Sequence, residues 1–210
     1  MKAHWIKLAV VCAVVAPSFA YAQAGDFMVR ARATYLKPAD KSQAIPSLGV
    51  ATDAIEVSSK TIPEVDFVYF FTNNIAGELV LTVPQKHDVT INGIGKIGTF
   101  KHLPPTLLAQ YHFNPSGQFN PYVGAGINFT HISSVKLNVP GVGDLDLEST
   151  SVGPALQAGF DVRLDKHWSL NFDVKYVQIR SDVTLKATNT KVSEVEVDPY
   201  LISVGVGYRF

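Results

Sequence analysis

The chain has 210 residues, of which 47% are hydrophobic and 17% charged, and its eighteen basic side chains equal its eighteen acidic ones. This balance lacks the basic bias of nucleic-acid-binding proteins, so we expect no nucleic-acid partner. The single cysteine, Cys12, lies in an N-terminal segment that resembles a secretory signal peptide. We therefore expect no disulfide and no thiol chemistry in the mature chain.

The first 22 residues have the three parts of a signal peptide. Lys2 and Lys7 precede an apolar run over residues 8–16, and small residues at Ala20 and Ala22 close the segment at cleavage-site spacing. This predicts a cleaved signal peptide over residues 1–22 and one domain over residues 23–210, with an uncleaved membrane anchor as the alternative. Beyond residue 22 there is no apolar run of roughly 18 residues, as a transmembrane helix requires.

The last eleven residues predict a strand with one lipid-facing side. Successive side chains of a strand point to opposite faces, so one face carries Tyr200, Ile202, Val204, Val206, Tyr208 and Phe210. Aromatic side chains bracket the aliphatic ones on this face, as in strands whose ends lie at the two membrane interfaces. A chain that enters a membrane without helices must form a closed barrel, because every backbone group needs a partner there.

Eight alternating segments can be distinguished, over residues 26–36, 62–71, 75–84, 107–113, 121–133, 152–164, 168–180 and 200–210. Short turns near 72–74, 114–120 and 165–167 alternate with long connections near 37–61, 85–103, 134–150 and 181–198. Outer-membrane barrels have short periplasmic turns and long external loops. The sequence therefore predicts an all-β protein, an eight-stranded antiparallel transmembrane β-barrel in the outer membrane of a Gram-negative bacterium.

The inward faces of these segments carry charges of both signs. A barrel of eight strands barely holds its own side chains, and unpaired buried charges are costly. We therefore expect a paired network that closes the lumen near its periplasmic end, formed by Arg30, Arg32, Asp66, Glu78, Asp161, Arg163, Asp173, Lys175 and Arg209. The inward apolar residues, several of them expected nearer the external half, would line a channel: Met28, Val68, Phe70, Val80, Leu108 and Leu201.

Several motifs resemble the OmpW family of outer-membrane proteins, including its AlkL-like branch. They are the stretches 69–79, 86–88, 102–106, 110–113 and 121–128, and the C-terminal Gly207-Tyr-Arg-Phe210. The resemblance covers essentially the whole mature chain. It implies an eight-stranded barrel with a narrow, largely apolar channel for the uptake of small hydrophobic molecules, which in a related branch leave sideways through the wall into the bilayer.

A sideways opening requires a place where the wall fails to pair its backbone. Proline lacks the N–H donor and is confined to sheet edges and bulges, so Pro84, Pro104, Pro105 and Pro154 are candidates, with Pro104-Pro105 favoured. The alternative is that these prolines only shape the entries of loops. Lys175 stands where an apolar side chain would make a better gate; it either pairs with a carboxylate or makes the channel more polar.

No constellation of residues points to catalysis, so we expect no enzyme and no catalytic residue. His87 and Asp88 are fewer ligands than a metal site needs, and we expect neither metal nor cofactor. His112 faces inward and is expected to be a satisfied lumen histidine.

Two functions remain open. The first is a channel for small hydrophobic molecules with lateral exit; the alternative is a sealed structural or adhesive barrel whose external loops bind lipopolysaccharide, bacteriocins or phage. The partners that we expect are outer-membrane lipid and lipopolysaccharide, small hydrophobic solutes, and the outer-membrane assembly machinery through the C-terminal Phe210.

Overall fold

The computed structural model describes residues 24–44 and 50–210, and the predicted signal peptide lies outside these ranges. The described residues form fifteen strands that belong to one sheet. Over the same ranges, no helix has the length and apolar character to cross a membrane.

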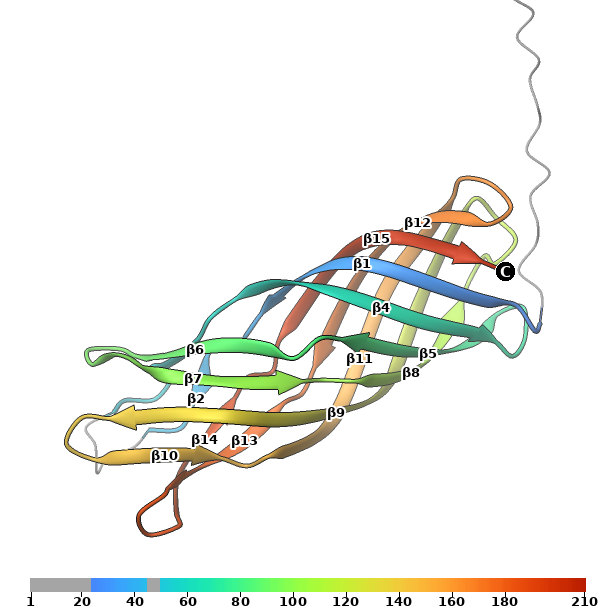
Figure 1. Ribbon diagram of the computed structural model, residues 1–210. Helices are drawn as coiled ribbons and strands as arrows, with labels where there is room; N and C mark the ends of the chain where they lie inside the picture. The colour runs from blue at the N-terminus through green and yellow to red at the C-terminus, as the bar shows by residue number, and fades with distance from the viewer. Residues whose placement is uncertain (1–23, 45–49) are drawn as a thin grey trace, which may run out of the picture.

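Eight strands form the closed wall of the barrel (Figure 1). Each pairs antiparallel with its neighbours in the ring, which closes where β9 pairs with β11. This confirms the predicted eight-stranded antiparallel barrel. In ring order the wall strands are β1 (Phe27–Lys37), β4 (Lys60–Phe70), β5 (Ile75–Thr82), β8 (Thr106–His112), β9 (Phe119–Val139), β11 (Thr150–Arg163), β12 (Trp168–Val177) and β15 (Tyr200–Arg209).

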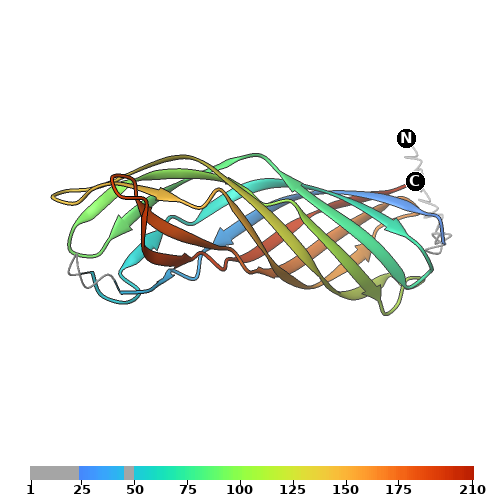
Figure 2. The same ribbon diagram turned by 90° about the horizontal axis from the view of Figure 1, so that it is seen from below.

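The four long connections were expected to be loops. They contain seven further strands instead. We call these seven strands, together with the end of β9, the extension. In Figure 2 the extension continues the barrel at the end opposite the C-terminus. Its strands are β2 (Lys41–Ser42), β3 (Ile55–Val57), β6 (Gln85–Ile91), β7 (Gly95–Leu103), β10 (Gly143–Leu147), β13 (Arg180–Leu185) and β14 (Thr190–Glu196).

The β6–β7 hairpin shows why these segments fold. His87, Val89 and Ile91 alternate with exposed residues and are buried inside the extension. Asn92-Gly93 is a strong hairpin signal, and Gly93 has φ +84°, a conformation that favours glycine. The alternation of apolar and polar residues and the Asn92-Gly93 turn were both visible in the sequence. The segment was nevertheless expected to be a loop because the connection is long.

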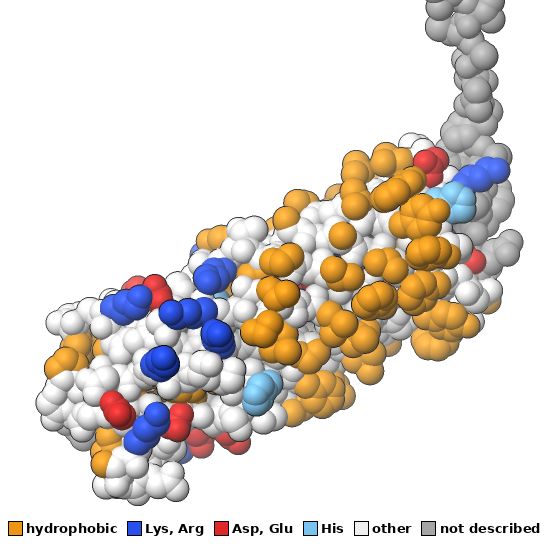
Figure 3. Space-filling view, viewed as in Figure 1, with side chains coloured by type: hydrophobic (Ala, Val, Ile, Leu, Met, Phe, Trp, Pro, Cys, Tyr) orange, Lys and Arg blue, Asp and Glu red, His pale blue; other side chains and the backbone are white. Residues whose placement is uncertain are grey.

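The outer face of the wall is a continuous apolar belt. Val204 on β15, Leu107 on β8 and Val152 on β11 are each more than half exposed. Tyr69 with Phe71 and Tyr208 with Phe210 form edge-to-face aromatic pairs at the short-turn end. Figure 3 shows the hydrophobic side chains gathered over the half nearest the C-terminus, whereas Lys and Arg gather over the extension. The belt is therefore the lipid-facing surface, and the extension lies on the extracellular side.

A charge at Val204 tests this assignment of faces. Val204→Arg is expected to lower the free energy of unfolding in lipid vesicles by about 2–4 kcal/mol, because an arginine near the bilayer midplane faces hydrocarbon. Asn138→Arg, at an outward position of β9 in the extension, serves as the control and should change stability little. Equal losses in urea titrations of the two variants would show that the belt does not face lipid.

Candidate functional site

Eight charged side chains meet at one level of the lumen, and we call them the charged layer: Arg30, Arg32, Glu64, Asp66, Glu78, Asp161, Asp173 and Lys175. They come from β1, β4, β5, β11 and β12. Strand register brings them together, because Arg30 lies opposite Asp66 and Arg32 opposite Glu64. All eight are almost completely buried.

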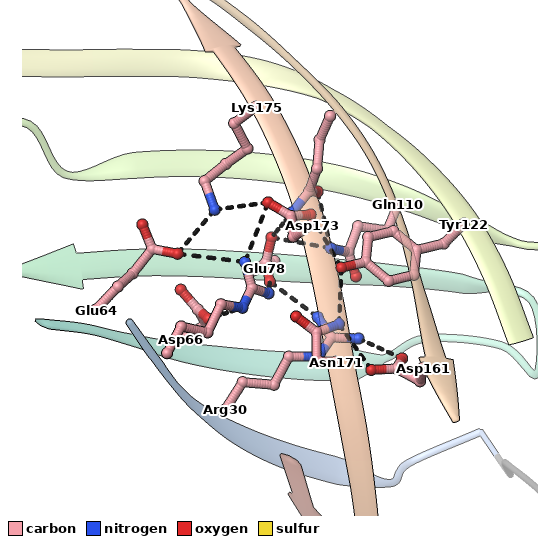
Figure 4. Close-up of polar contacts among 12 residues, drawn as sticks. Arg30, Glu64, Asp66, Glu78, Gln110, Tyr122, Asp161, Asn171, Asp173 and Lys175 are labelled. Carbon is pink, nitrogen blue, oxygen red and sulfur yellow. Dashed lines mark hydrogen bonds and ion pairs between the residues drawn. The ribbon is translucent and has the colours of Figure 1, made fainter. Parts of the chain in front are cut away.

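Two arginines hold the centre of the charged layer (Figure 4). The Arg30 guanidinium donates to Glu78 at 2.9 Å and to Asp161 at 2.7 Å. The Arg32 guanidinium donates to the same Glu78 oxygen at 2.7 Å, and its Nε lies 2.8 Å from Asp66 Oδ2. Glu78 is therefore clamped between two cations.

Lys175 completes the layer on the side nearer the extension. Its ammonium donates to Glu64 at 2.8 Å and to Asp173 at 2.9 Å. The Arg32 Nη1 lies 3.2 Å from the same Glu64 oxygen and 3.3 Å from Asp173 Oδ1. Lys175 is thus paired with carboxylates, as the first of the two sequence-based alternatives expected, and it also lines the lower cavity.

Neutral side chains supply further hydrogen bonds. Gln110 and Gln157 donate to Glu78 Oε2 at 2.9 and 2.7 Å, Tyr122 donates to Asp173 at 2.9 Å, and Asn171 donates to Asp161 at 2.9 Å. Such bonds are needed to offset the desolvation of buried ions. These neutral partners and Glu64 were not among the residues predicted for the network, although strand alternation from Asp66 identifies Glu64 as inward-facing.

Arg163 and Arg209 do not belong to the charged layer, contrary to the sequence-based expectation. Arg163 donates to the backbone carbonyls of Pro115 and Ser116 at the periplasmic turn. Arg209 lies over the Phe70 ring, 4.5 Å from its centroid. Strand alternation places both side chains inward but does not give their height along the barrel axis, and both lie at the periplasmic mouth.

The six apolar lumen residues also separate into two groups, so they do not line one continuous channel. Met28, Val68 and Phe70 pack together with Ala76 beside the periplasmic turns. Val80, Leu108 and Leu201 belong to a different cluster on the extracellular side of the charged layer. The first three therefore lie on the far side of the charged layer from any solute that arrives from outside.

Two narrow cavities follow one another on the extracellular side of the charged layer. The lower cavity has apolar walls that include Leu36, Val80 and Leu201, and its lining reaches Glu64 and Lys175 of the layer. The upper cavity lies within the extension, and Ser181 is its only polar lining residue among those described. The upper cavity has a volume of only about 30 Å³ and the lower cavity of about 10 Å³. A larger solute therefore requires lining side chains to move.

The wall has a break in its pairing beside the lower cavity. The ladder between β5 and β8 ends at Val80 opposite Thr106, and the ladder between β6 and β7 begins at Gln85 opposite His102. Pro84, Pro104 and Pro105 lie between these two ends, and Pro104 lines the lower cavity. We call this place the wall gap.

Pro154 does not share this environment. It lies within an unbroken ladder, opposite Ile127 of β9, and its carbonyl accepts a hydrogen bond from the Gln178 N–H at 3.0 Å. Three of the four candidate prolines therefore gather at one place in the wall, and Pro154 is removed from the set.

The described residues contain no group of three or more histidine, cysteine, aspartate or glutamate side chains that could hold a metal ion. His112 has partners for both ring nitrogens, with Asn120 at 2.9 Å and Gln110 at 3.2 Å. Asp88 points away from His87 and pairs with Lys96 on the exposed face of the β6–β7 hairpin.

Comparison with known proteins gives a consistent result. The family model described as OmpW matches residues 23–210. Outer membrane protein W of Vibrio cholerae is 36% identical over 222 residues, covering all of both chains. The crystal structure of the outer membrane protein OprG from Pseudomonas aeruginosa has a TM-score of 0.76 and 32% identity, and the match covers 90% of this chain and 97% of that chain. A Pseudomonas aeruginosa protein called dibenzothiophene metabolism operon protein PahQ is 26% identical over 172 residues, 77% of this chain and 76% of PahQ.

Removal of one charge tests the charged layer. Arg32→Met is expected to lower the free energy of unfolding by about 3–5 kcal/mol, because the buried carboxylates around it lose their partner. Lys96→Met removes the same charge from an exposed ion pair with Asp88 and should have little effect. Similar midpoints for wild type and Arg32→Met in urea would contradict the role of the layer.

Proposed function

Because this chain belongs to the OmpW family of outer-membrane proteins, we propose that it carries small hydrophobic solutes across the outer leaflet of a Gram-negative outer membrane. In this proposal a solute enters through the extension, passes the upper and lower cavities, and leaves sideways into the bilayer at the wall gap. The observation that carries the proposal is that apolar cavities end on a layer of paired charges.

The charged layer makes a straight passage unfavourable. A solute that crossed the layer would have to separate buried ion pairs. One of them joins Arg30 Nη1 to Glu78 Oε1 at a distance of 2.9 Å. An apolar solute offers no hydrogen bonds in return, so the separated charges would be left without partners. A path that stays above the layer avoids this cost.

The wall gap supplies the other half of the path. Residues 81–84 and 103–105 lie between the two ladders, so the wall there is held by fewer interstrand hydrogen bonds. Leu81, Val83 and Leu107 are exposed on the outer surface beside the gap, where the apolar belt meets lipid. A solute in the lower cavity is thus separated from hydrocarbon by a stretch of wall whose two facing segments share no ladder.

The name of the PahQ relative connects that protein with the metabolism of dibenzothiophene, a fused aromatic molecule. A solute of that kind fits the proposal, because its flat apolar surface gains free energy on leaving water for an apolar cavity.

A second role, binding of lipopolysaccharide, has an observation of its own. Lys86 lies directly opposite Lys101 in the β6–β7 register, and both are exposed on the outer face of the extension. Like charges directly opposite each other destabilise a sheet, and basic groups near a membrane surface attract anionic head groups. Phosphates of lipopolysaccharide would relieve this repulsion, so we propose that the pair anchors the barrel in the outer leaflet. No feature of the described residues singles out bacteriocins or phage.

The exit route can be tested with a matched pair of variants. Val80 and Val68 both point into the lumen and are buried, but they lie on opposite sides of the charged layer. Val80→Asn is expected to slow entry of N-phenyl-1-naphthylamine into outer-membrane vesicles several-fold, because it adds a polar group to the lower cavity. Val68→Asn should leave the rate unchanged. Heat-modifiability on gels checks that each variant is folded. Equal slowing of entry by two folded variants would indicate a straight path to the periplasm.

The lysine pair has a separate test. Replacing Lys86 and Lys101 by glutamine is expected to weaken binding of purified lipopolysaccharide to the barrel in nanodiscs and to reduce its dependence on salt. Lys191→Gln is the control, because that ammonium already pairs with Asp182 at 2.6 Å. An equal effect at Lys191 would mean that overall charge, and not the opposed pair, attracts the lipid.

A further inference from the structure

Two histidines stack in the β6–β7 hairpin, near residues that line the upper and the lower cavity, although neither histidine lines a cavity itself. His87 on β6 and His102 on β7 are diagonal neighbours in the hairpin, with ring centroids 4.7 Å apart and planes within 6°. Both side chains point inward and are almost completely buried. Phe100, which lines the upper cavity, stacks on His87 at 5.7 Å, and Pro104, two residues beyond His102, lines the lower cavity.

The hydrogen bonding of this pair is incomplete. His87 Nδ1 lies 2.6 Å from the Ser58 carbonyl oxygen. A carbonyl can only accept, so Nδ1 carries the hydrogen and Nε2 of the neutral ring is an acceptor. Within the part of the chain that the structure describes, neither His87 Nε2 nor either nitrogen of His102 has a hydrogen-bond partner. Buried polar atoms normally have partners, so these three are exceptional.

Both rings are uncharged at neutral pH. Burial lowers the pKa of His102 to about 3, and the nearby His87 acts in the same direction. Burial also lowers the pKa of His87; Lys60 adds to this effect, whereas the bond to Ser58 and the charge of Asp88 oppose it. The pair therefore presents neutral donors and acceptors and not a fixed positive charge.

The geometry does not suit a metal ion. The lone pairs of an imidazole lie in the plane of its ring, so two nearly parallel stacked rings do not direct their nitrogens at a common point. The described residues also provide no third histidine, cysteine or carboxylate to complete such a site.

We propose that His87 and His102 form a hydrogen-bonding site for a solute that is apolar except for a single hydroxyl group, such as a phenol or a long-chain alcohol. A hydroxyl both donates and accepts, so it can donate to Nε2 of His87 or pair with either nitrogen of a neutral His102. A hydrocarbon leaves all three nitrogens unpartnered, and a carboxylate has no hydrogen for His87 Nε2. This inference rests on the proposed pathway and assigns it a preferred class of solute.

The test compares two solutes that differ by one hydroxyl. Binding of 1-naphthol and of naphthalene is measured by equilibrium dialysis against the full barrel in nanodiscs, with empty nanodiscs subtracted. His102→Leu is expected to lower the ratio of naphthol to naphthalene affinity by about two- to tenfold, as loss of one neutral hydrogen bond implies. The control is His131→Leu on β9, which removes an exposed imidazole from the position opposite Leu103.

An unchanged ratio in His102→Leu, or an equal fall in His131→Leu, would overturn the site. Tighter binding of octanoate than of 1-octanol to the wild type would overturn the hydroxyl class in favour of an anion. Failure of the pathway is a different result, because then N-phenyl-1-naphthylamine entry would not depend on the protein at all.

A measurement on the wild type avoids any loss of folding in the variant. In barrel with ¹⁵N-labelled histidine, 1-naphthol should shift the ring nitrogen resonances of His87 and His102, whereas naphthalene should leave the nitrogen signals close to their original positions. Ring nitrogens that respond equally to both solutes, or to neither, would contradict the site.

Discussion

The clamp on Glu78 is the interaction on which the rest of the lumen depends. One Glu78 oxygen accepts from Arg30 and Arg32 and the other from Gln110 and Gln157, so four donors from three wall strands meet at one carboxylate. An eight-stranded barrel has no room for a water-filled centre, and buried ions without partners are costly. Once two arginines point inward, the surrounding side chains must pair them. The same pairing closes the barrel to apolar solutes.

This closure gives the extracellular half its functional character. The lower cavity is mostly apolar, with Thr82, Thr106 and Asn128 as its neutral polar lining residues, and it extends to Glu64 and Lys175. A solute that reaches these two residues meets charges that are already paired. The wall gap at Pro84, Pro104 and Pro105 lies at the same level as that cavity. The histidine pair above it adds one place with free hydrogen-bonding capacity. Entry, selection and exit can therefore all lie above the charged layer.

Sequence periodicity predicted the wall well, because alternation with period two directly records which face of a strand meets lipid. Val204 and its neighbours were correctly placed on that face, and Arg30 and Asp66 were correctly placed inside. The height of a side chain along the barrel axis is set by barrel closure and interstrand register. The alternation of residues along one strand carries no information on either. Arg163 and Arg209 were therefore recognised as inward but wrongly grouped with the charged layer, and Phe70 was grouped with apolar residues that lie on the other side of that layer. The stacking of His87 on His102 likewise depends on the register of a hairpin that was taken for a loop.

The most direct test of the account is to locate a bound apolar solute. Crystals of the barrel soaked with 1-bromonaphthalene would show the bromine by anomalous scattering. We expect the signal on the extracellular side of the charged layer, beside Val80 and Leu108 and toward the wall gap at Pro104. Signal on the periplasmic side, beside Met28 and Phe70, would show that solutes cross the charged layer and would contradict the central claim.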